Sequence, residues 1–581
     1  MRNRKTAKRG PLVLAAIALG APVAALAASG GAHDVVIRGG MIYDGSGAKP
    51  YVGDVAIDGK KITYVGPPRP MRAERTIDAT GKAVAPGFIN MLSGAQESLL
   101  VDGRAESDLF QGVTLEVMGE GDSIAPLNDS MAKLAQSREG DIKYPVNWRS
   151  LDQYYHVLEQ KGISVNVASV VGAATARANV LGERDVQPTP EQLREMRRVV
   201  RSAMQDGAVA LGSALIYAPG TFAKTPELKA LAAEAGRCGG IYITHMRSEG
   251  DDLLGAVDET VSIAQASGAP AEIYHLKAAG QANWPKLEAA IGKIQAARAS
   301  GVRITTNMYP YTAVATGFDA SMPHWVLDGG LEAWIARMKE PAVRARLVRE
   351  LQHPDFESAL VAAGPEGTLL LGFNNEKLKP LAGKTLAEVA KLRGESPEET
   401  MIDLIIEDGS RVSVAYTLMS DDNVRREVAL PFMSFGSDEA GEAPEGVFLK
   451  SIPHPRAYGT FARILARYVR DEKEITLQDA VHRMSGLPAA NLSLRGRGLL
   501  KSGYFADIVV FEPDKIQDHA TYENPRQLAT GVDEVFVNGG LAFKDGEVTA
   551  VRSGQAVRGR GWTGWPDGGC RASAANWHWS W

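Results

Sequence analysis

The stretch VAPGFINM, residues 84–91, reads as the first strand of a repeated pattern of short apolar runs. The runs are separated by helical sequence or long loops and cover residues 84–91, 113–120, 163–171, 208–215, 240–245, 271–276, 303–309 and 432–437. Connections such as PEQLREMRRVVRSAMQDG have apolar residues at helical spacing and end in Gly. Eight alternating units of this kind predict an α/β fold, a closed (β/α)8 TIM-type barrel.

The sequence on either side of these runs has a different pattern. Residues 34–82 and 500–552 contain short β-type runs separated by Gly and Asp turns, which predicts a small β-sandwich domain built from both chain ends. The barrel is expected over residues 83–499. Its segment 312–431, between strands 7 and 8, is too long for a loop and is expected to be a lid insertion with helices of its own. The tail, residues 553–581, is rich in Trp and Gly and stays unassigned.

The N-terminus carries a compartment signal. Basic residues precede the apolar run 11–27, which ends in the small-x-small pattern Ala-Leu-Ala. This pattern predicts a cleaved signal peptide, residues 1–27, and a periplasmic or secreted protein. A membrane anchor is the alternative, but the run is short and is broken by Gly20 and Pro22. No second stretch is long and apolar enough to span a bilayer, so no membrane partner is expected after cleavage.

Charge and cysteine content exclude some classes of protein. The chain has 64 basic and 69 acidic residues, a net charge of −5, which does not indicate a nucleic-acid partner. Two cysteines, Cys238 and Cys570, exclude a disulfide scaffold and a four-cysteine zinc site. They could pair, but one lies mid-chain and the other in the tail, so two free thiols are expected. The sequence leaves the oligomeric state open.

Polar residues at the strand ends supply candidate chemistry, because the carboxyl ends of barrel strands carry the active site. Four of the eight runs end in Glu120, His245, His275 and Asp438. Two imidazoles and two carboxylates at one mouth form a ligand set suited to zinc. Each residue also has a purely structural interpretation: Asp438 suits a helix start, Glu120 a loop, and a lone His is often only hydrogen-bonded.

A set of motifs then carries a family resemblance. They are APGFI, QGVTLEVMGEG, LGSALIYAPGTFA, ITHMRSEG, YHLKAAG, NMYPYTA, SDE and HPRAYGTFARIL, and GYFADIVVF in the flanking β segment. In this order, residues 84–463 resemble the D-aminoacylase (N-acyl-D-amino-acid deacylase) group of the amidohydrolase superfamily. The resemblance implies zinc-dependent hydrolysis of N-acyl-D-amino acids or of peptides that contain D-residues.

The resemblance also implies a ligand set. The group's tightly held metal has one cysteine and two histidines, and the histidines fall on His245 and His275. Counting back from Ala-Pro at 125–126 puts Glu120 in the cysteine's place, whereas counting forward from Gly-Val-Thr gives Gly121. Glutamate is an acceptable zinc ligand, and Glu116, earlier in the strand, is the less favoured substitute.

The second metal position of that group uses a first-strand His-x-His, which this chain lacks. Leu92 and Gly94 occupy those places. We therefore expect one zinc per chain. One metal is enough to polarise a carbonyl and to lower the pKa of a bound water to about 7.

The roles of the remaining residues follow from this mechanism. Asp438 is expected to accept a proton from the attacking water and to pass it to the departing nitrogen. By the resemblance, Lys277, Arg456 and Tyr217 bind the carboxylate of the substrate. The structural alternatives are an ion pair that holds the lid for Arg456 and simple packing for Tyr217.

Two other functions remain open. One is a different amidohydrolase, a dipeptidase or a cyclic amidase, although a cyclic amidase would usually need the two-metal site. The other is a metal-free binding protein derived from such an enzyme, for which the loss of ligands at Leu92 and Gly94 would be typical. Metal analysis separates these alternatives.

Overall fold

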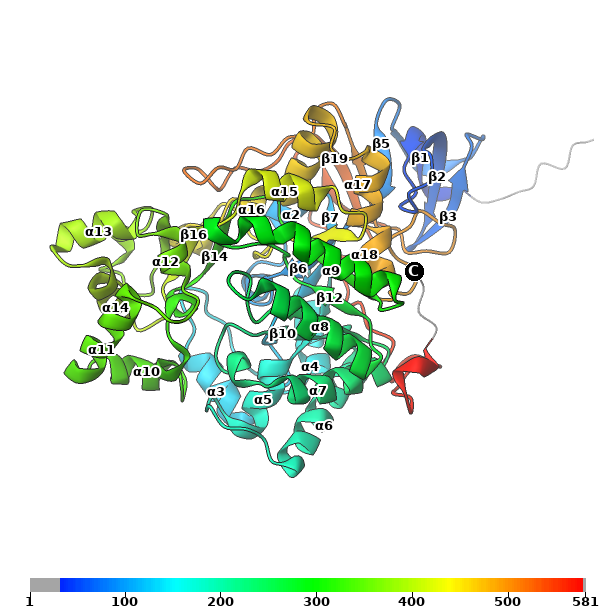
Figure 1. The fold of residues 1–581 in the computed structure, drawn as a ribbon. Coiled ribbons are helices and arrows are strands. Elements are labelled where there is room, and N and C mark those ends of the chain that lie inside the picture. Colours follow the sequence, from blue (N-terminus) through cyan, green and yellow to red (C-terminus); the bar gives the residue numbers. More distant parts are fainter. Residues whose placement is uncertain (1–31, 578–581) are drawn as a thin grey trace, which may run out of the picture.

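A computed structural model describes residues 32–577, and Figure 1 shows short strands at its centre with helices around them. These central strands form two parallel sheets. The first has the order β6 (Phe88–Ser93), β7 (Val113–Met118), β8 (Asn166–Ser169). The second has the order β17 (Met433–Phe435), β13 (Ile304–Met308), β12 (Ala271–Ile273), β11 (Ile241–His245), β10 (Ala210–Ala214), β9 (Val171–Gly172).

Backbone hydrogen bonds join the two sheets at both edges. On one side, Val209 N donates to Ser169 O over 3.0 Å, and β8 and β9 are consecutive pieces of one run. On the other side, Asp438 N donates to Leu92 O over 2.8 Å. The strands therefore close into the barrel that the sequence predicts, and the expected fold class is confirmed.

The surrounding helices follow the local signals read from the sequence. The helices α6 (Pro190–Asp206), α7 (Thr225–Arg237), α8 (Leu253–Ser267) and α9 (Leu287–Ala299) connect successive strands. In α6, the Thr189 side chain caps the first turn, Gln192 bonds back to the Thr189 backbone, and Gly207 ends the helix with left-handed backbone angles. These helices bury their apolar faces against the barrel.

Both chain ends contribute to one β domain. Its nine-stranded sheet includes β1 (His33–Ile42), β2 (Tyr51–Asp58), β3 (Lys61–Gly66), β4 (Ala73–Asp78) and β5 (Ala83–Pro86) from the first part. The second part supplies β18 (Ile508–Phe511), β19 (Val532–Val537), β20 (Gly540–Lys544) and β21 (Glu547–Val548). The strands β5 and β18 pair antiparallel, which places the two parts side by side (Figure 1).

The segment between β13 and β17 is a folded insertion. It contains a three-stranded sheet, β14 (Ala313–Gly317), β16 (Ser413–Thr417) and β15 (Thr368–Gly372). The helices α10 (Leu331–Met338), α11 (Pro341–Gln352), α13 (Leu386–Arg393) and α14 (Pro397–Asp408) pack on it around a hydrophobic core of their own. In Figure 1 these helices project to one side of the barrel.

The expectation of two free thiols is wrong, because Cys238 and Cys570 form a disulfide. The tail crosses the barrel on the side where the strands begin: Val557 N bonds to Val167 O, and Gly559 N bonds to Gly207 O. Gly559 is required there because a Cβ atom would lie 2.4 Å from the carbonyl oxygen of Ala208. The tail thus brings Cys570 to the end of α7, where Cys238 lies.

The predicted signal peptide, residues 1–27, lies outside the described residues. Between residues 32 and 577, no helix combines the length and the apolar character that crossing a bilayer requires.

Candidate functional site

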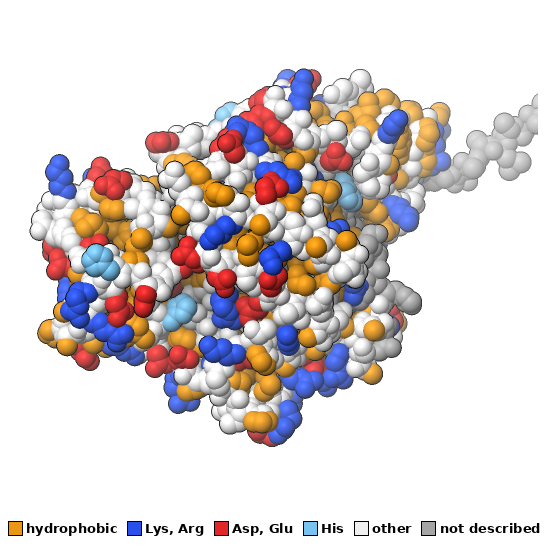
Figure 2. Space-filling model, viewed as in Figure 1, with side chains coloured by type: hydrophobic (Ala, Val, Ile, Leu, Met, Phe, Trp, Pro, Cys, Tyr) orange, Lys and Arg blue, Asp and Glu red, His pale blue; other side chains and the backbone are white. Residues whose placement is uncertain are grey.

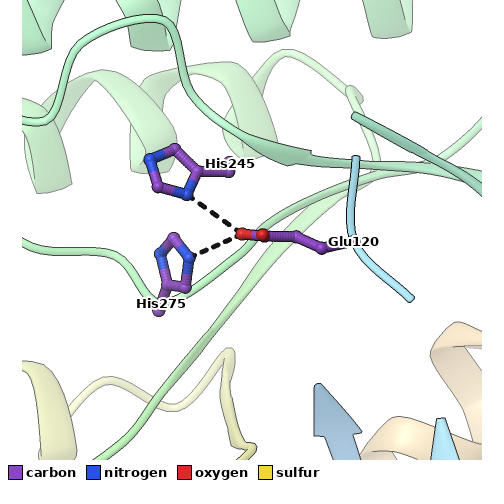
Figure 3. Close-up of side chains that lie close together, drawn as sticks. All are labelled: Glu120, His245 and His275. Atoms are coloured by element: carbon purple, nitrogen blue, oxygen red, sulfur yellow. Dashed lines mark hydrogen bonds and ion pairs between the residues drawn. The ribbon is translucent and has the colours of Figure 1, made fainter. Parts of the chain in front are cut away.

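Three of the predicted metal ligands converge at the carboxyl ends of the barrel strands. His245 is the last residue of β11, while Glu120 and His275 follow β7 and β12 by two residues each. Glu120 Oε1 lies 3.0 Å from His245 Nδ1 and 2.9 Å from His275 Nε2. Figure 3 shows both imidazoles pointing at this carboxylate, and the three ligand atoms lie within 4.8 Å of one another.

The local backbone aims two of these side chains. His275 has a left-handed backbone with φ of 32°, which is uncommon for a residue other than Gly. Its backbone N–H donates to Asn307 Oδ1 over 2.8 Å, and this bond helps to hold the strained geometry. The Glu120 backbone lies directly against β10, where a Cβ atom on Gly212 would be 1.9 Å from Glu120 O.

The cluster's electrostatics and donor chemistry fit a divalent cation. Burial raises the pKa of Glu120, but the neighbouring His245 and His275 lower it by more, so the pKa is well below its usual value. Burial and Lys277 lower the pKa of His275, yet the carboxylates of Glu249 and Glu120 raise it to about 9. Two nitrogens and one carboxylate oxygen are ligands that zinc prefers.

Glu116, the alternative third ligand, lies elsewhere. Its carboxylate accepts a hydrogen bond from Asn90 Nδ2 over 2.9 Å inside the barrel. Burial raises its pKa to about 7, while hydrogen bonds from Ser93, Asp108 and Asn90 lower it by less. The structure therefore brings Glu120, and not Glu116, to the two histidines.

Asp438 and Arg456 form a pair beside this cluster. Asp438 follows β17 with a left-handed φ of 53°, held by its bond to Leu92 O. Arg456 Nη1 lies 2.8 Å from Asp438 Oδ2, and Arg456 Nη2 donates to Asp438 O over 2.6 Å. Burial raises the pKa of Asp438, and the positive charge of Arg456 opposes this rise.

The other two predicted substrate contacts also lie here. The Tyr217 ring meets the His245 ring edge-on at 5.3 Å, and its hydroxyl bonds Thr316 of β14 over 2.7 Å. Lys277 Nζ is buried and lies 2.6 Å from Glu249 Oε1 and 2.7 Å from His275 Nδ1. All the predicted site residues line one cleft of about 1940 Å³ between the barrel mouth and the insertion, namely Glu120, Tyr217, His245, His275, Lys277, Asp438 and Arg456.

The cleft contains three further residues that sequence reasoning missed. Glu249 contacts Lys277 and His275. Its position in the motif ITHMRSEG, four residues after His245, could have indicated that it belongs to the site. Tyr309, in NMYPYTA, lies under the Arg456 guanidinium with 4.4 Å between ring centroid and Cζ. Arg411 of the insertion lies 5.0 Å from the Tyr217 ring, and no sequence signal pointed to it.

The places of the missing His-x-His hold no ligand. Leu92 is buried and packs in the barrel core, while Gly94 lines the cleft. A Cβ atom on Gly94 would lie 3.3 Å from Ala440 N, so the main chain after Asp438 comes close to this position. Within residues 32–577, Glu120, His245 and His275 form the single group that could hold a metal ion.

Outside the cleft, the surface carries mixed charge. Figure 2 shows acidic and basic side chains interspersed over the visible face, with no extended region of one sign. This distribution agrees with the near balance of 64 basic and 69 acidic residues in the chain.

Comparison with known proteins finds amidohydrolases and deacylases as relatives. Residues 75–543 match the sequence model described as the amidohydrolase family. The chain is 31% identical over 515 residues to N-acyl-D-glutamate deacylase of Alcaligenes xylosoxydans xylosoxydans, which covers 88% of this chain and 93% of that protein.

Two solved structures share the fold over nearly the whole chain. One is N-acyl-D-glutamate deacylase from Bordetella bronchiseptica, complexed with zinc and a phosphonate inhibitor that mimics the tetrahedral reaction intermediate. It has a TM-score of 0.76 and 28% identity over 91% of this chain and 100% of that chain. The other is D-aminoacylase, with a TM-score of 0.75 and 28% identity over 90% and 100%. Its binuclear metal centre shows one-metal activation and second-metal attenuation.

Proposed function

Because the chain belongs to the amidohydrolase family, we propose that it is a zinc-dependent enzyme that deacylates N-acyl-D-amino acids or related D-residue-containing peptides. The observation that carries the proposal is the meeting of Glu120, His245 and His275 at the carboxyl ends of the barrel strands. The likeness to deacylases over most of the chain supports the substrate class.

Glu120, His245 and His275 would hold the zinc ion. When bound, zinc supplies Lewis acidity: it polarises an amide carbonyl and lowers the pKa of water. Asp438 accepts the proton of the attacking water and then gives it to the departing nitrogen, because water is a poor nucleophile and an amine is a poor leaving group. Its raised pKa suits this task, since a base with a higher pKa holds the proton better.

Arg456 binds and orients the substrate carboxylate. Its guanidinium is nearly fully buried in the cleft wall and presents donors in a fixed fork, which suits a carboxylate. Lys277 adds a second positive charge, and Tyr217 lies against the His245 ring at the other side of the cleft. These contacts favour a substrate whose scissile amide is next to a free carboxylate.

We propose one zinc ion per chain. Leu92 and Gly94 provide no ligand on β6, and the main chain at Ala440 approaches the Gly94 position. The one-metal activation described for D-aminoacylase supports the view that a single ion is sufficient.

The test is metal analysis combined with a substrate panel. The purified, dialysed protein should contain about one zinc per chain and should hydrolyse N-acetyl-D-amino acids but not their L-enantiomers or a hydantoin. Hydrolysis of the hydantoin alone would identify a cyclic amidase, and cleavage of dipeptides alone a dipeptidase. A protein without metal and without activity would be a binding protein, and each of these results would refute the proposal.

We also propose that the mature protein is periplasmic or secreted. The support is the N-terminal signal pattern together with the Cys238–Cys570 disulfide, because disulfides persist in oxidising compartments. Fractionation of cells that express the full chain should place the protein outside the cytoplasm and shortened by about 27 residues, as the signal-peptide pattern predicts. A full-length cytoplasmic protein would refute this proposal.

A further inference from the structure

We propose that Glu249 is a positioning residue that fixes the tautomers of both zinc-binding imidazoles at once. The inference rests on the proposed zinc site and concerns a residue that the reaction itself does not consume.

The two imidazoles face the site with different nitrogens. His245 presents Nδ1 to Glu120 Oε1, whereas His275 presents Nε2 to the same oxygen. The ring planes are nearly perpendicular, at 86°, with centroids 4.6 Å apart. The nitrogens on the far sides of the rings are therefore His245 Nε2 and His275 Nδ1, and both lie near Glu249.

Glu249 offers a separate oxygen to each far nitrogen. Its Oε1 lies 3.0 Å from His275 Nδ1. Lys277 Nζ also lies 2.7 Å from this nitrogen, so Lys277 keeps only its bond to Glu249 Oε1 when Nδ1 carries the proton. Its Oε2 lies 3.7 Å from His245 Nε2, the buried atom that has no hydrogen-bond partner. A movement of less than 1 Å would complete the second bond, since N–H···O bonds are about 2.9–3.0 Å long.

The tautomer requirement explains why one carboxylate serves both rings. A neutral imidazole carries one N–H, so the nitrogen that binds a metal must be the unprotonated one. The proton must then sit on the far nitrogen, where an acceptor stabilises it. A carboxylate is an acceptor at both oxygens and so selects Nε2–H on His245 and Nδ1–H on His275.

The structure also holds Glu249 in place. Lys277 Nζ donates to Oε1 over 2.6 Å, and the Glu249 backbone carbonyl accepts from Ala279 N over 2.8 Å. The Lys277 charge compensates the buried carboxylate, which would otherwise be costly. Lys277 is therefore tied to the metal centre through Glu249, in addition to its proposed contact with substrate.

The decisive experiment measures zinc affinity in Glu249→Gln by competition with a chelator. The amide keeps one acceptor oxygen but turns an N–H₂ donor toward the other imidazole N–H, so one of the two bonds is lost. We expect zinc affinity to fall by about 10–100-fold, the usual effect of removing an outer-shell partner. The zinc-free variant should keep the circular dichroism spectrum of the zinc-free parent, which excludes a general folding defect, although its melting temperature should fall because Lys277 loses its buried partner.

The matched control is Glu427→Gln on α15 (Asp421–Val428). Glu427 is a buried carboxyl whose electrostatic partners are Lys277 and Glu249 rather than the imidazoles, and burial raises its pKa well above the usual value. Glutamine mimics its neutral form, so zinc affinity should stay at the parent value.

The outcomes are distinguishable. Equal zinc affinity in Glu249→Gln and in the parent overturns the positioning role while leaving the proposed function intact. An equal loss of affinity in both variants also overturns it, because a general effect of buried charge would then be the cause. A parent protein that binds no zinc overturns the proposed function and this inference together.

Discussion

Arg456 and Asp438 make two contacts with each other: an ion pair between Nη1 and the carboxylate at 2.8 Å, and a hydrogen bond from Nη2 to the backbone carbonyl at 2.6 Å. The proposed base and the proposed carboxylate-binding cation are thus one unit. A substrate carboxylate that binds Arg456 shares the charge that otherwise faces Asp438. We therefore expect substrate binding and the basicity of Asp438 to be coupled through this arginine.

The Asp438→Asn variant should keep its zinc and lose most of its rate. The amide cannot accept a proton, and loss of a general base typically costs about 10²–10⁴-fold in kcat. Elemental analysis and steady-state kinetics on the same sample check both parts. A variant with near-parental kcat would show that the base is another residue.

The pH–rate profile should show an acid limb that belongs to Asp438. Asp438 acts only as the carboxylate, and burial raises its pKa from the ordinary 3.8. Activity should therefore fall with decreasing pH at a higher pH than an exposed aspartate would give. Profiles of kcat/KM with zinc in excess test this, and an acid limb at or below pH 3.8 would contradict it.

The Arg456→Met variant should be impaired in two separable ways. Loss of a charge-assisted hydrogen bond, worth about 1.5–3 kcal/mol, should lower kcat/KM by about 10–150-fold, mainly through KM. The positive charge also lowers the pKa of Asp438, so its removal should move the acid limb to higher pH. A rise in KM with an unchanged acid limb would mean that the two residues are not coupled.

The two candidate third ligands can be compared directly. Glu120→Gln should weaken zinc binding, because the variant loses the negative charge that faces both histidines. Glu116→Gln should leave zinc content unchanged, since Glu116 bonds to Asn90 inside the barrel. Zinc stoichiometry of the two folded variants decides which glutamate is the third ligand. The reverse result would make Glu116 the ligand.

Glu116→Gln should also change how stability depends on pH. Burial raises the folded-state pKa of Glu116 to about 7 from 4.5, so its contribution to stability is full below pH 4.5 and is lost as pH rises through 7. Glutamine mimics the protonated acid and removes this loss. The Tm of the variant minus the Tm of the parent should therefore be larger at pH 8 than at pH 5. A difference that does not change with pH would contradict the raised pKa of Glu116.

Strand-end chemistry was predictable from the sequence because barrel strands impose a common geometry. A polar residue that ends an apolar run must lie at the mouth, so Glu120, His245, His275 and Asp438 could be found one by one. Glu249 was missed because it lies in a loop, where spacing from His245 does not determine which way a side chain points. Its role depends on two rings from different strands.

The disulfide and the position of Arg411 show a second limit of prediction from the sequence. Whether Cys238 meets Cys570 depends on the path of a tail with no periodic pattern, and that path is set by close backbone contacts such as Gly559 against Ala208. Arg411 reaches the cleft only because the whole insertion folds against the barrel mouth. Neither outcome follows from local propensity.

The pairing of β5 with β18 has a consequence for the order in which the chain is made. Strand β5 is among the first elements to be synthesised, and its partner begins at Ile508, after the entire barrel. Residues 554–559, which bond to the start of β8 and to the end of α6, come later still. Strand β5 therefore keeps an open sheet edge until the whole barrel has been synthesised, and a chain truncated before Cys570 leaves Cys238 unpaired.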